Sequence, residues 1–271
     1  MPVWIAFLLG IVQGLTEFLP ISSSGHLALM QNLFKIEQYT ANHIAFDIIL
    51  HLGTLFAVII AFWDDIVELV RSLIGLIVDK FHIKGHPGRR MLVLLIVATL
   101  PLVVAALLES KIEAMFQSPL LIGCALIFTA ILLFFADRLG GGKKTARDAS
   151  VKDALLVGLM QLLAVFPGVS RSGATMCGGL FAKFDRDFAV RFAFLLSIPA
   201  VLGATVFKLP DVLASGGEAF LPIVVGFFAA AISGYCAIAL VKLLVKRNSF
   251  KYFSIYCACV GVLSIVLSLM K

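Results

Sequence analysis

Long apolar runs are the feature that most restricts how this chain can fold. Runs of about 18 or more mainly apolar residues recur along its 271 residues, and each can cross a hydrocarbon core of about 30 Å. Hydrophobic residues make up 61% of the chain and charged residues only 14%, whereas a soluble domain carries about 25% charged residues. Because lipid offers the backbone no hydrogen-bond partner, spanning runs of this length must be helices. The sequence therefore predicts an all-α integral membrane protein.

Six apolar segments are predicted to be full spans, and two others are not. The six predicted spans are roughly 42–63, 91–108, 119–138, 186–207, 220–245 and 252–270. Segments 3–34 and 153–183 are each broken near the middle by a polar loop that contains glycine, and each half is too short to cross alone. Non-helical backbone is tolerated at membrane depth only inside protein or beside a polar cavity, so both segments are predicted re-entrant helix-loop-helix hairpins. Residues 64–80 are predicted to form an amphipathic, interfacial stretch.

The two hairpins repeat one motif at a constant offset of 148 residues. The identical pairs are Gly10 and Gly158, Gln13 and Gln161, Leu15 and Leu163, Phe18 and Phe166, Ser22 and Ser170, Ser24 and Ser172, and Gly25 and Gly173. Chance in an apolar sequence could supply the leucine and the phenylalanine. It is a poor explanation for Ser-x-Ser-Gly in register with a glutamine nine residues upstream. The sequence therefore predicts two structural repeats.

Basic residues indicate the topology of these repeats. Lysine and arginine cluster in loops 71–90 and 138–152, before the fourth span and between the last two spans. If every basic cluster lies in the cytoplasm, all six segments can cross the membrane without a conflict with the positive-inside rule. The net charge of +6 could suggest nucleic-acid binding, but these residues do not form one stripe, so no nucleic acid is expected. Both termini are predicted to lie outside.

The predicted organisation is a pair of inverted-topology repeats. The first repeat is 1–138, the basic cytoplasmic linker is 139–152, and the second repeat is 153–271. Each repeat has one hairpin and three spans, so an odd number of crossings inverts the second copy. The first hairpin then enters from outside and the second from the cytoplasm. Inverted repeats with broken helices place their sites near the membrane midplane, so a site is expected where the polar loops meet.

The polar residues of the two loops have the chemistry of an anion site. A carboxylate or an arginine at membrane depth costs at least about 2.5–3.5 kcal/mol and therefore marks function. Glycine ahead of a helix start leaves backbone N–H groups directed at the gap, where they attract anions together with the helix dipole. The candidates of the first loop are Gln13, Glu17, Ser22, Ser23, Ser24, Gly25 and His26, and those of the second are Ser170, Arg171, Ser172, Gly173 and Thr175.

These residue types together favour phosphoryl chemistry. Arg171 offers a planar fork to two phosphate oxygens. Glu17 and Gln13, one helical turn apart, offer oxygen ligands to a divalent cation such as Mg or Ca. Ser23 and His26 supply a nucleophile and a base. In either loop alone, serine and glycine would more often be helix-packing residues, but the duplication and the buried charges favour a functional interpretation.

Asp47 and His51 have two interpretations. They lie at i and i+4 in the first predicted span, so they share one face of a helix. They could be ligands or supporting partners of the site, or a polar contact with no role in chemistry. The second interpretation is favoured at this stage.

Two longer motifs resemble the signatures of a known family. Residues 13–26, QGLTEFLPISSSGH, resemble the [E/Q]xxxE-FLP-x-SS-x-GH signature of bacterial undecaprenyl-diphosphate phosphatases of the BacA type. Residues 167–175, PGVSRSGAT, resemble the second signature, PG-x-SRSG-x-T, and the resemblance covers essentially the whole chain. It implies hydrolysis of undecaprenyl diphosphate to the monophosphate in the bacterial cell membrane, with a divalent cation. It also implies recycling of the lipid carrier for peptidoglycan synthesis, and bacitracin resistance.

By position, the resemblance gives the loop residues their roles. It makes Glu17 and Gln13 the metal-binding pair, with one carboxylate because position 13 is glutamine, and Arg171 the phosphate clamp. Ser23 as nucleophile with His26 as base is favoured over direct attack by His26. The supporting hydroxyls at the substrate are those of Ser22, Ser24, Ser170, Ser172 and Thr175.

A transporter is the alternative to an enzyme. Inverted repeats around a midplane anion site are also the plan of many transporters, so a polyprenyl-phosphate flippase would use Arg171 and the backbone N–H groups equally well. Only an enzyme needs Glu17, His26 and a serine as well, which favours the enzyme. The expected partners are a polyprenyl diphosphate and membrane lipids, with the active site open to the external face. A homodimer is compatible with the sequence, which does not specify an oligomeric state.

The predicted topology can be tested by labelling single cysteines in a variant without the five native cysteines. Residues 36–40, 112–117 and 211–217 should react with an impermeant maleimide added outside intact cells, and residues 143–148 should react only after permeabilisation. Labelling of 143–148 from outside would contradict the inverted-repeat arrangement.

Overall fold

The computed structural model describes residues 1–34, 43–80, 82–83, 85–106, 112, 115–116, 118–139, 141–214, 220–246 and 250–270. Across these ranges the chain is helical, apart from one isolated parallel bridge between Lys144 and Phe184. The helices are α1 Val3–Phe18, α2 Ser23–Phe34, α3 His43–Ala61, α4 Trp63–Val78, α5 Pro87–Thr99, α6 Leu102–Ala106, α8 Pro119–Leu139, α9 Val151–Leu163, α10 Arg171–Phe181, α11 Arg186–Ala214, α12 Phe220–Lys246 and α13 Phe250–Leu269.

The all-α membrane class is confirmed. Within the described residues, five helical segments are long and apolar enough to cross a membrane. They are Pro87–Ala105, Pro119–Arg138, Arg186–Lys208, Phe220–Val245 and Phe250–Leu269, which correspond to the last five predicted spans. The first predicted span, 42–63, corresponds to α3, which meets α4 at an angle of 84° and passes the same test only together with it. Such a bend would turn α4 toward the membrane plane, as predicted for residues 64–80.

Each predicted hairpin is a pair of short helices broken at the expected loop. In the first, α1 ends at Phe18 and α2 begins at Ser23; in the second, α9 ends at Leu163 and α10 begins at Arg171. The loops enforce these breaks. Ser22 has φ +73° and Gly168 has φ +96°, and this left-handed backbone cannot continue a right-handed helix.

The first helix of each hairpin packs closely on a span from the other half of the chain. α1 packs along α12, and α9 packs on α5. Glycine allows this approach: a Cβ on Gly10 would lie 2.6 Å from the Gly226 carbonyl oxygen, and one on Gly158 would lie 2.6 Å from that of Ala98. Small residues let helix backbones approach where lipid gives no hydrophobic drive to associate. The two hairpins are therefore held by matching contacts.

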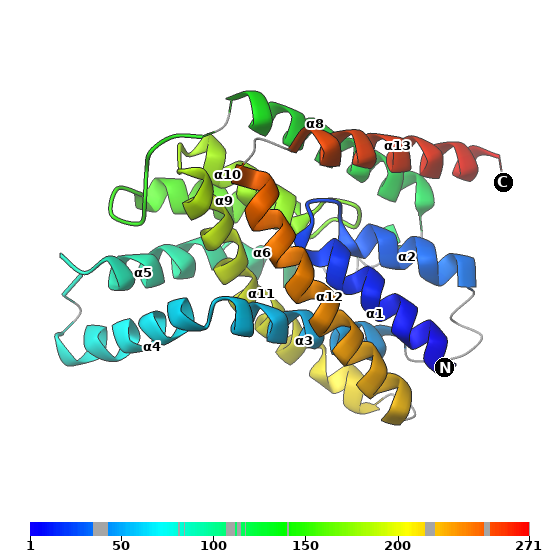
Figure 1. Ribbon diagram of the computed structural model, residues 1–271, viewed down its shortest axis with the longest axis horizontal. Coiled ribbons are helices and arrows are strands. Elements are labelled where there is room, and N and C mark those ends of the chain that lie inside the picture. Colours follow the sequence, from blue (N-terminus) through cyan, green and yellow to red (C-terminus); the bar gives the residue numbers. More distant parts are fainter. Residues whose placement is uncertain are drawn as a thin grey trace.

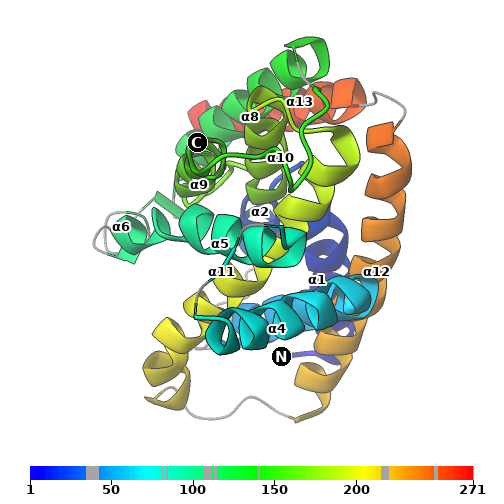
Figure 2. The same ribbon diagram turned by 90° about the vertical axis from the view of Figure 1, so that its left-hand side faces the viewer.

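The last helix of each predicted repeat packs against its counterpart. α8 and α13 run side by side along the top of Figure 1 and remain together in Figure 2. A Cβ on Gly123 would lie 2.8 Å from the Gly261 carbonyl oxygen, and a Cβ on Gly261 would lie 2.8 Å from that of Gly123. The hydroxyls of Ser254 and Ser264 donate to the Ala130 and Pro119 carbonyls at 2.7 and 2.8 Å. This reciprocal contact is the kind that two copies related by a two-fold axis would make.

Both termini lie at the right-hand end of Figure 1, whereas the connection between α4 and α5 lies at the opposite end. This agrees with the predicted side of the basic loop 71–90. Residues 143–148 are described, but 36–40 lie outside the described residues, as do parts of 112–117 and 211–217. The repeat boundaries and the re-entrant character of the hairpins stay predictions.

Gly123→Ala should lower the free energy of unfolding by about 1–3 kcal/mol, because overpacked helix contacts cost that much. The new Cβ would lie 2.7 Å from an Ile265 side-chain carbon as well as 2.8 Å from the Gly261 oxygen. Thermal unfolding of the purified protein in detergent measures the effect. Gly203→Ala is the matched control, since no atom lies within 4 Å of its Cβ position. Equal midpoints for the two variants would contradict the close approach of α8 and α13.

Candidate active site

The repeated Ser-x-Ser-Gly motif caps the second helix of each hairpin. The hydroxyl oxygen of Ser22 accepts from the Gly25 N–H at 3.3 Å, and that of Ser170 accepts from the Gly173 N–H at 3.1 Å. The hydroxyl oxygens of Ser22 and Ser24 lie 3.3 Å apart, and those of Ser170 and Ser172 lie 3.2 Å apart. Capping serines satisfy N–H groups that a helix start leaves without partners. Ser22 and Ser170 are 2% and 1% exposed, so their first role is structural.

The second serine of each motif joins the two loops. Ser24 accepts from the Gly168 N–H at 3.5 Å, and Ser172 donates to the Leu19 carbonyl at 3.2 Å. The glycines lie at the same junction: a Cβ on Gly25 would lie 3.4 Å from the Gly168 Cα, and one on Gly173 would lie 3.2 Å from the Pro20 Cβ. Each loop therefore holds the other through the second serine and the glycine of its motif, although Ser24 accepts its bond and Ser172 donates its own.

This junction brings two helix starts together. Apart from the capped glycines, the first N–H groups of α2 and α10, those of Ser23, Ser24, Arg171 and Ser172, have no acceptor within the described residues. N–H groups and helix dipoles at such starts attract anions. The expected anion cradle is therefore compatible with the backbone. Thr175 lies deeper, and its hydroxyl donates to the Arg171 carbonyl at 2.8 Å within α10, so it supports this helix start from behind.

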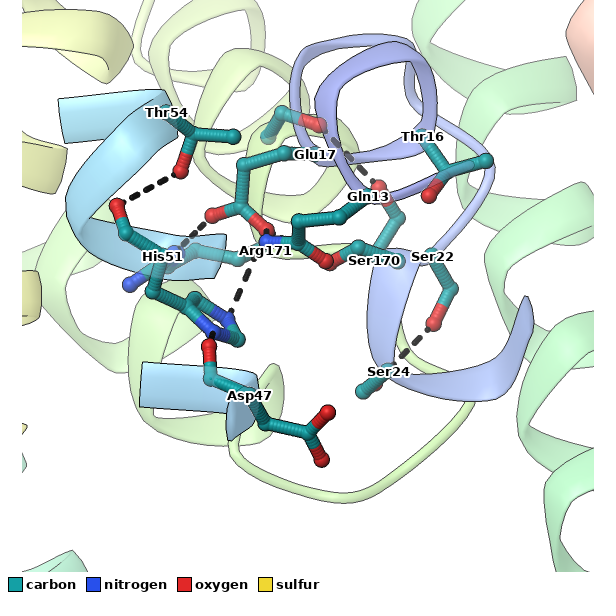
Figure 3. A network of polar contacts seen from close by, with 12 residues as sticks. Gln13, Thr16, Glu17, Ser22, Ser24, Asp47, His51, Thr54, Ser170 and Arg171 are labelled. Atoms are coloured by element: carbon teal, nitrogen blue, oxygen red, sulfur yellow. Dashed lines mark hydrogen bonds and ion pairs between the residues drawn. The ribbon is translucent and has the colours of Figure 1, made fainter. Parts of the chain in front are cut away.

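Glu17 is the centre of the polar network (Figure 3). Its side chain is 4% exposed, and one carboxylate oxygen, Oε1, accepts from the Arg171 guanidinium. The other oxygen, Oε2, accepts from the Ser23 hydroxyl at 2.6 Å and from the Gln13 amide at 3.0 Å. Three side chains from the two hairpins thus converge on the Glu17 carboxylate. Sequence reasoning singled out all three, and Glu17 as well.

The two halves of this network occupy equivalent places in the repeated motif. Ser23 and Arg171 are each the middle residue of Ser-x-Ser-Gly, 148 residues apart. The partner of Glu17 at the same offset is Val165, so the second repeat has the glutamine but no carboxylate at that position. Both middle residues contact the Glu17 carboxylate. The site is therefore asymmetric although its scaffold is duplicated.

His26 does not lie where the sequence analysis placed it. Its Nδ1 is 2.7 Å from the Ser22 carbonyl oxygen, which can only accept, so Nδ1 carries the proton. Its Nε2 is 2.8 Å from the Tyr256 hydroxyl. Both ring nitrogens are thus engaged away from Ser23, whose hydroxyl donates to Glu17 instead. The expected Ser23–His26 bond is absent among the described residues, because α2 carries the imidazole toward α13.

His51 is the residue that the sequence analysis undervalued. Its Nδ1 lies 2.8 Å from the Asp47 carbonyl oxygen in α3, which leaves Nε2 facing Glu17, 3.7 Å from Oε2. Asp47 accepts at 2.7 Å from the amide of Gln31, so its carboxylate ties α3 to α2. The i, i+4 spacing placed both residues on one helix face. It contained no signal that this face turns toward Glu17 (Figure 3).

The donor set fits a hard divalent cation. Gln13 is 0% exposed, and its side-chain oxygen has no hydrogen-bond partner within the described residues. A buried acceptor without a partner is uncommon, and this oxygen is available to a ligand. The nitrogen of the same amide donates to Oε2 of Glu17 at 3.0 Å. The described residues hold no cluster of three or more His, Cys, Asp or Glu side chains, so a cation here would draw its other ligands from water or a bound phosphate.

The fold and the site define a multi-pass, all-α membrane protein with a buried carboxylate–guanidinium centre between two capped loops. A family model described as "Bacitracin resistance protein BacA" matches residues 6–263. The chain therefore belongs to the BacA family.

Similar proteins cover the chain almost completely. A protein of Methanosphaera stadtmanae is 42% identical over 97% of both chains, and one of Alkaliphilus metalliredigens is 42% identical over 98% of both. A protein of Geotalea daltonii is 41% identical over 96% of both. All three carry the name undecaprenyl-diphosphatase.

Proposed function

We propose that this protein hydrolyses undecaprenyl diphosphate to undecaprenyl phosphate and inorganic phosphate. It would thereby recycle the lipid carrier for peptidoglycan synthesis and give resistance to bacitracin. The observation that supports this most directly is the Ser23 hydroxyl, 2.6 Å from a carboxylate that Arg171 also contacts. A nucleophile bonded to a proton acceptor, next to an arginine, is a phosphoryl-transfer arrangement. The full-length relatives named undecaprenyl-diphosphatase supply the substrate. The comparisons give no support to the alternative, a flippase.

In this proposal Ser23 is the nucleophile and Glu17 is its proton acceptor, on the support of the 2.6 Å bond between them. The Ser23 oxygen attacks the terminal phosphorus, its proton passes to Glu17, and the bond from that phosphorus to the bridging oxygen breaks. Undecaprenyl phosphate leaves, and a phosphoserine remains. Water then attacks the phosphoserine, phosphate departs, and the Ser23 oxygen regains a proton from Glu17. His26 is replaced in the base role because neither of its ring nitrogens contacts Ser23.

Arg171 and the helix starts stabilise the charge that builds up on the phosphate. The guanidinium holds Glu17 with one nitrogen, and its side chain is 26% exposed, so other N–H groups can reach a phosphate. The serines at positions 22, 24, 170 and 172, and Thr175, act by holding these donors in place. Preorganised donors of this kind are usually the largest contribution to catalysis.

A divalent cation would be held by Glu17 and the free oxygen of Gln13. When bound, it would neutralise phosphate charge and polarise the bond to be broken. One carboxylate with phosphate oxygens and water as remaining ligands suits Mg²⁺, which keeps several waters, better than a Ca²⁺ site of six to eight protein oxygens.

We further propose that the site opens to the external face of the bacterial cell membrane. The support is the side on which the basic loops lie and the position of α1 and α2 near the end of the molecule that carries both termini (Figure 1). The inverted repeats 1–138 and 153–271 are proposed on the offset motif, with the matching loop contacts and the Gly123–Gly261 contact as support.

Phosphate release from a polyprenyl diphosphate by detergent-purified protein tests the function. We expect turnover by the wild type, and a fall of at least about 10³-fold in Ser23→Ala, because removing a covalent nucleophile costs that much or more. No release by the wild type would overturn the proposed function. Substrate labelled in the terminal phosphate should leave an acid-stable adduct on Ser23; an acid-labile adduct on His26 would reverse the assignment.

Arg171→Lys should remove most of the activity, by about 10²-fold or more, while the thermal midpoint stays near that of the wild type. Lysine keeps the charge but cannot hold Glu17 and phosphate with one planar group. Arg191→Lys is the control, since Arg191 pairs with Asp65 and Glu68, outside the Glu17 network. A fully active Arg171→Lys variant would contradict the phosphate-clamp role and leave Arg171 only to neutralise the charge of Glu17.

Chelation should abolish phosphate release, and added Mg²⁺ should restore it. Gln13→Met, which keeps the length of the side chain but removes the free oxygen, should raise the Mg²⁺ concentration for half-maximal activity at least fivefold. Gln161→Met is the control, because Gln161 is also buried with an unpartnered oxygen but lies beside Ala98 in the other repeat. Activity that survives excess chelator would remove the cation from the mechanism.

A further inference from the structure

Tyr256 in α13 hydrogen-bonds a candidate catalytic side chain, His26, and sequence analysis did not single it out. Its hydroxyl lies 2.8 Å from Nε2 of His26, and the two rings are nearly parallel, with centroids 5.6 Å apart. The Nδ1 of the same imidazole donates to the Ser22 carbonyl. In a neutral imidazole one nitrogen donates and the other accepts, so Nε2 accepts from the Tyr256 hydroxyl.

The position of Tyr256 is set by helix packing and not by His26. The Ser254 hydroxyl donates to the Ala130 carbonyl at 2.7 Å, which joins α13 to α8. The Cys257 thiol, fully buried, lies 3.6 Å from the Pro20 carbonyl oxygen of the first loop. These contacts hold α13 on either side of Tyr256. His26, by contrast, stands in the first turn of α2, where the Ser22 carbonyl holds Nδ1 and Tyr256 is the partner of Nε2.

We propose that Tyr256 is a positioning residue of the active site, which holds His26 in the Nδ1–H tautomer with Nε2 turned toward α13. The contact between Tyr256 and His26 is structural, and only its significance for catalysis rests on the proposed phosphatase function. The phenol keeps its bond in either protonation state: it donates to neutral Nε2 and accepts from a protonated one.

The consequence is a division of roles around Ser23. With Nε2 occupied, the imidazole takes no proton from Ser23 and does not compete with phosphate for the Ser23 hydroxyl. Glu17 is left as the proton acceptor of Ser23. His26 remains a fixed ring at the edge of the site. Second partners that orient a histidine in this way have measurable effects when removed.

Exposure supports the pairing from the side of the tyrosine. Tyr256 is 43% exposed on a helix whose outer face is apolar, with Ile255, Val262 and Leu263 more than half exposed. A hydroxyl facing lipid without a partner is costly, and His26 supplies that partner. Tyr252, one turn earlier and 70% exposed, has no such bond among the described residues and provides an internal comparison.

The experiment uses the full-length protein with ¹⁵N-labelled histidine, the His26 signals being assigned with His26→Gln. In the wild type, we expect the Nδ1 of His26 to carry the proton and Nε2 to show a hydrogen-bonded lone pair. In Tyr256→Phe, Nε2 should lose that bond and a second tautomer should appear. Reaction of His26 with diethyl pyrocarbonate, followed by mass spectrometry, should become about fivefold faster or more, as expected for loss of one hydrogen bond. Tyr252→Phe is the control and should match the wild type in both measurements.

Turnover supplies a second, independent readout. Tyr256→Phe should lower kcat about fivefold to tenfold with little change in KM, because the reacting groups and not the lipid contacts are disturbed. A wild-type His26 with its proton on Nε2, or Tyr256→Phe with unchanged tautomer and reactivity, would overturn the proposal. Neither the tautomer spectrum nor the diethyl pyrocarbonate reaction needs phosphatase activity. An inactive wild type would therefore overturn the proposed function, and the two measurements on His26 would still test the role of Tyr256. If Tyr256→Phe did not fold, the wild-type spectrum alone would decide.

Discussion

A buried pair of opposite charges, Glu17 and Arg171, is the interaction on which the rest of this structure depends. Each charge alone would cost several kilocalories per mole at membrane depth, and removing one partner from a buried pair costs about 3–5 kcal/mol. The two residues come from different hairpins, 154 positions apart. The hairpins must therefore meet, and they must meet in one register. The capped loops, the close glycine contacts and the packing of α1 on α12 and α9 on α5 are the means by which they do so.

The duplicated motif explains how such a site can be built from little sequence. Ser-x-Ser-Gly caps a helix start, and a second copy facing the first lets Ser24 and Ser172 each bond to the backbone of the opposite loop. The middle position of the motif is the one that remains free to differ. It is a serine in one copy and an arginine in the other, so the same geometry delivers a hydroxyl and a guanidinium to one carboxylate.

Much of this could be predicted from the sequence, because membrane burial makes polar residues conspicuous. Glu17 and Arg171 interrupt apolar helices, and the offset of 148 between the loops showed that their surroundings are equivalent. The spans followed from run length alone. The role of His26 could not be predicted in this way. Proximity to Ser23 in sequence suggested a base, but the Ser22 carbonyl and the Tyr256 hydroxyl engage both ring nitrogens of His26, and Tyr256 comes from a helix 230 residues away.

The sequence by itself determined the membrane class, the helical spans, the two capped loops and the side chains that carry charge into the membrane. It did so because hydrophobic length, glycine and buried charge are local properties with strong energetic consequences. Only the tertiary structure decided which side chains share a proton or a charge. His51 from α3 reaches Glu17, Tyr256 from α13 occupies His26, and Gln13 keeps a free oxygen, each through helix packing. Helices of similar apolar composition can pack in many ways, so no local pattern specifies which polar groups become neighbours.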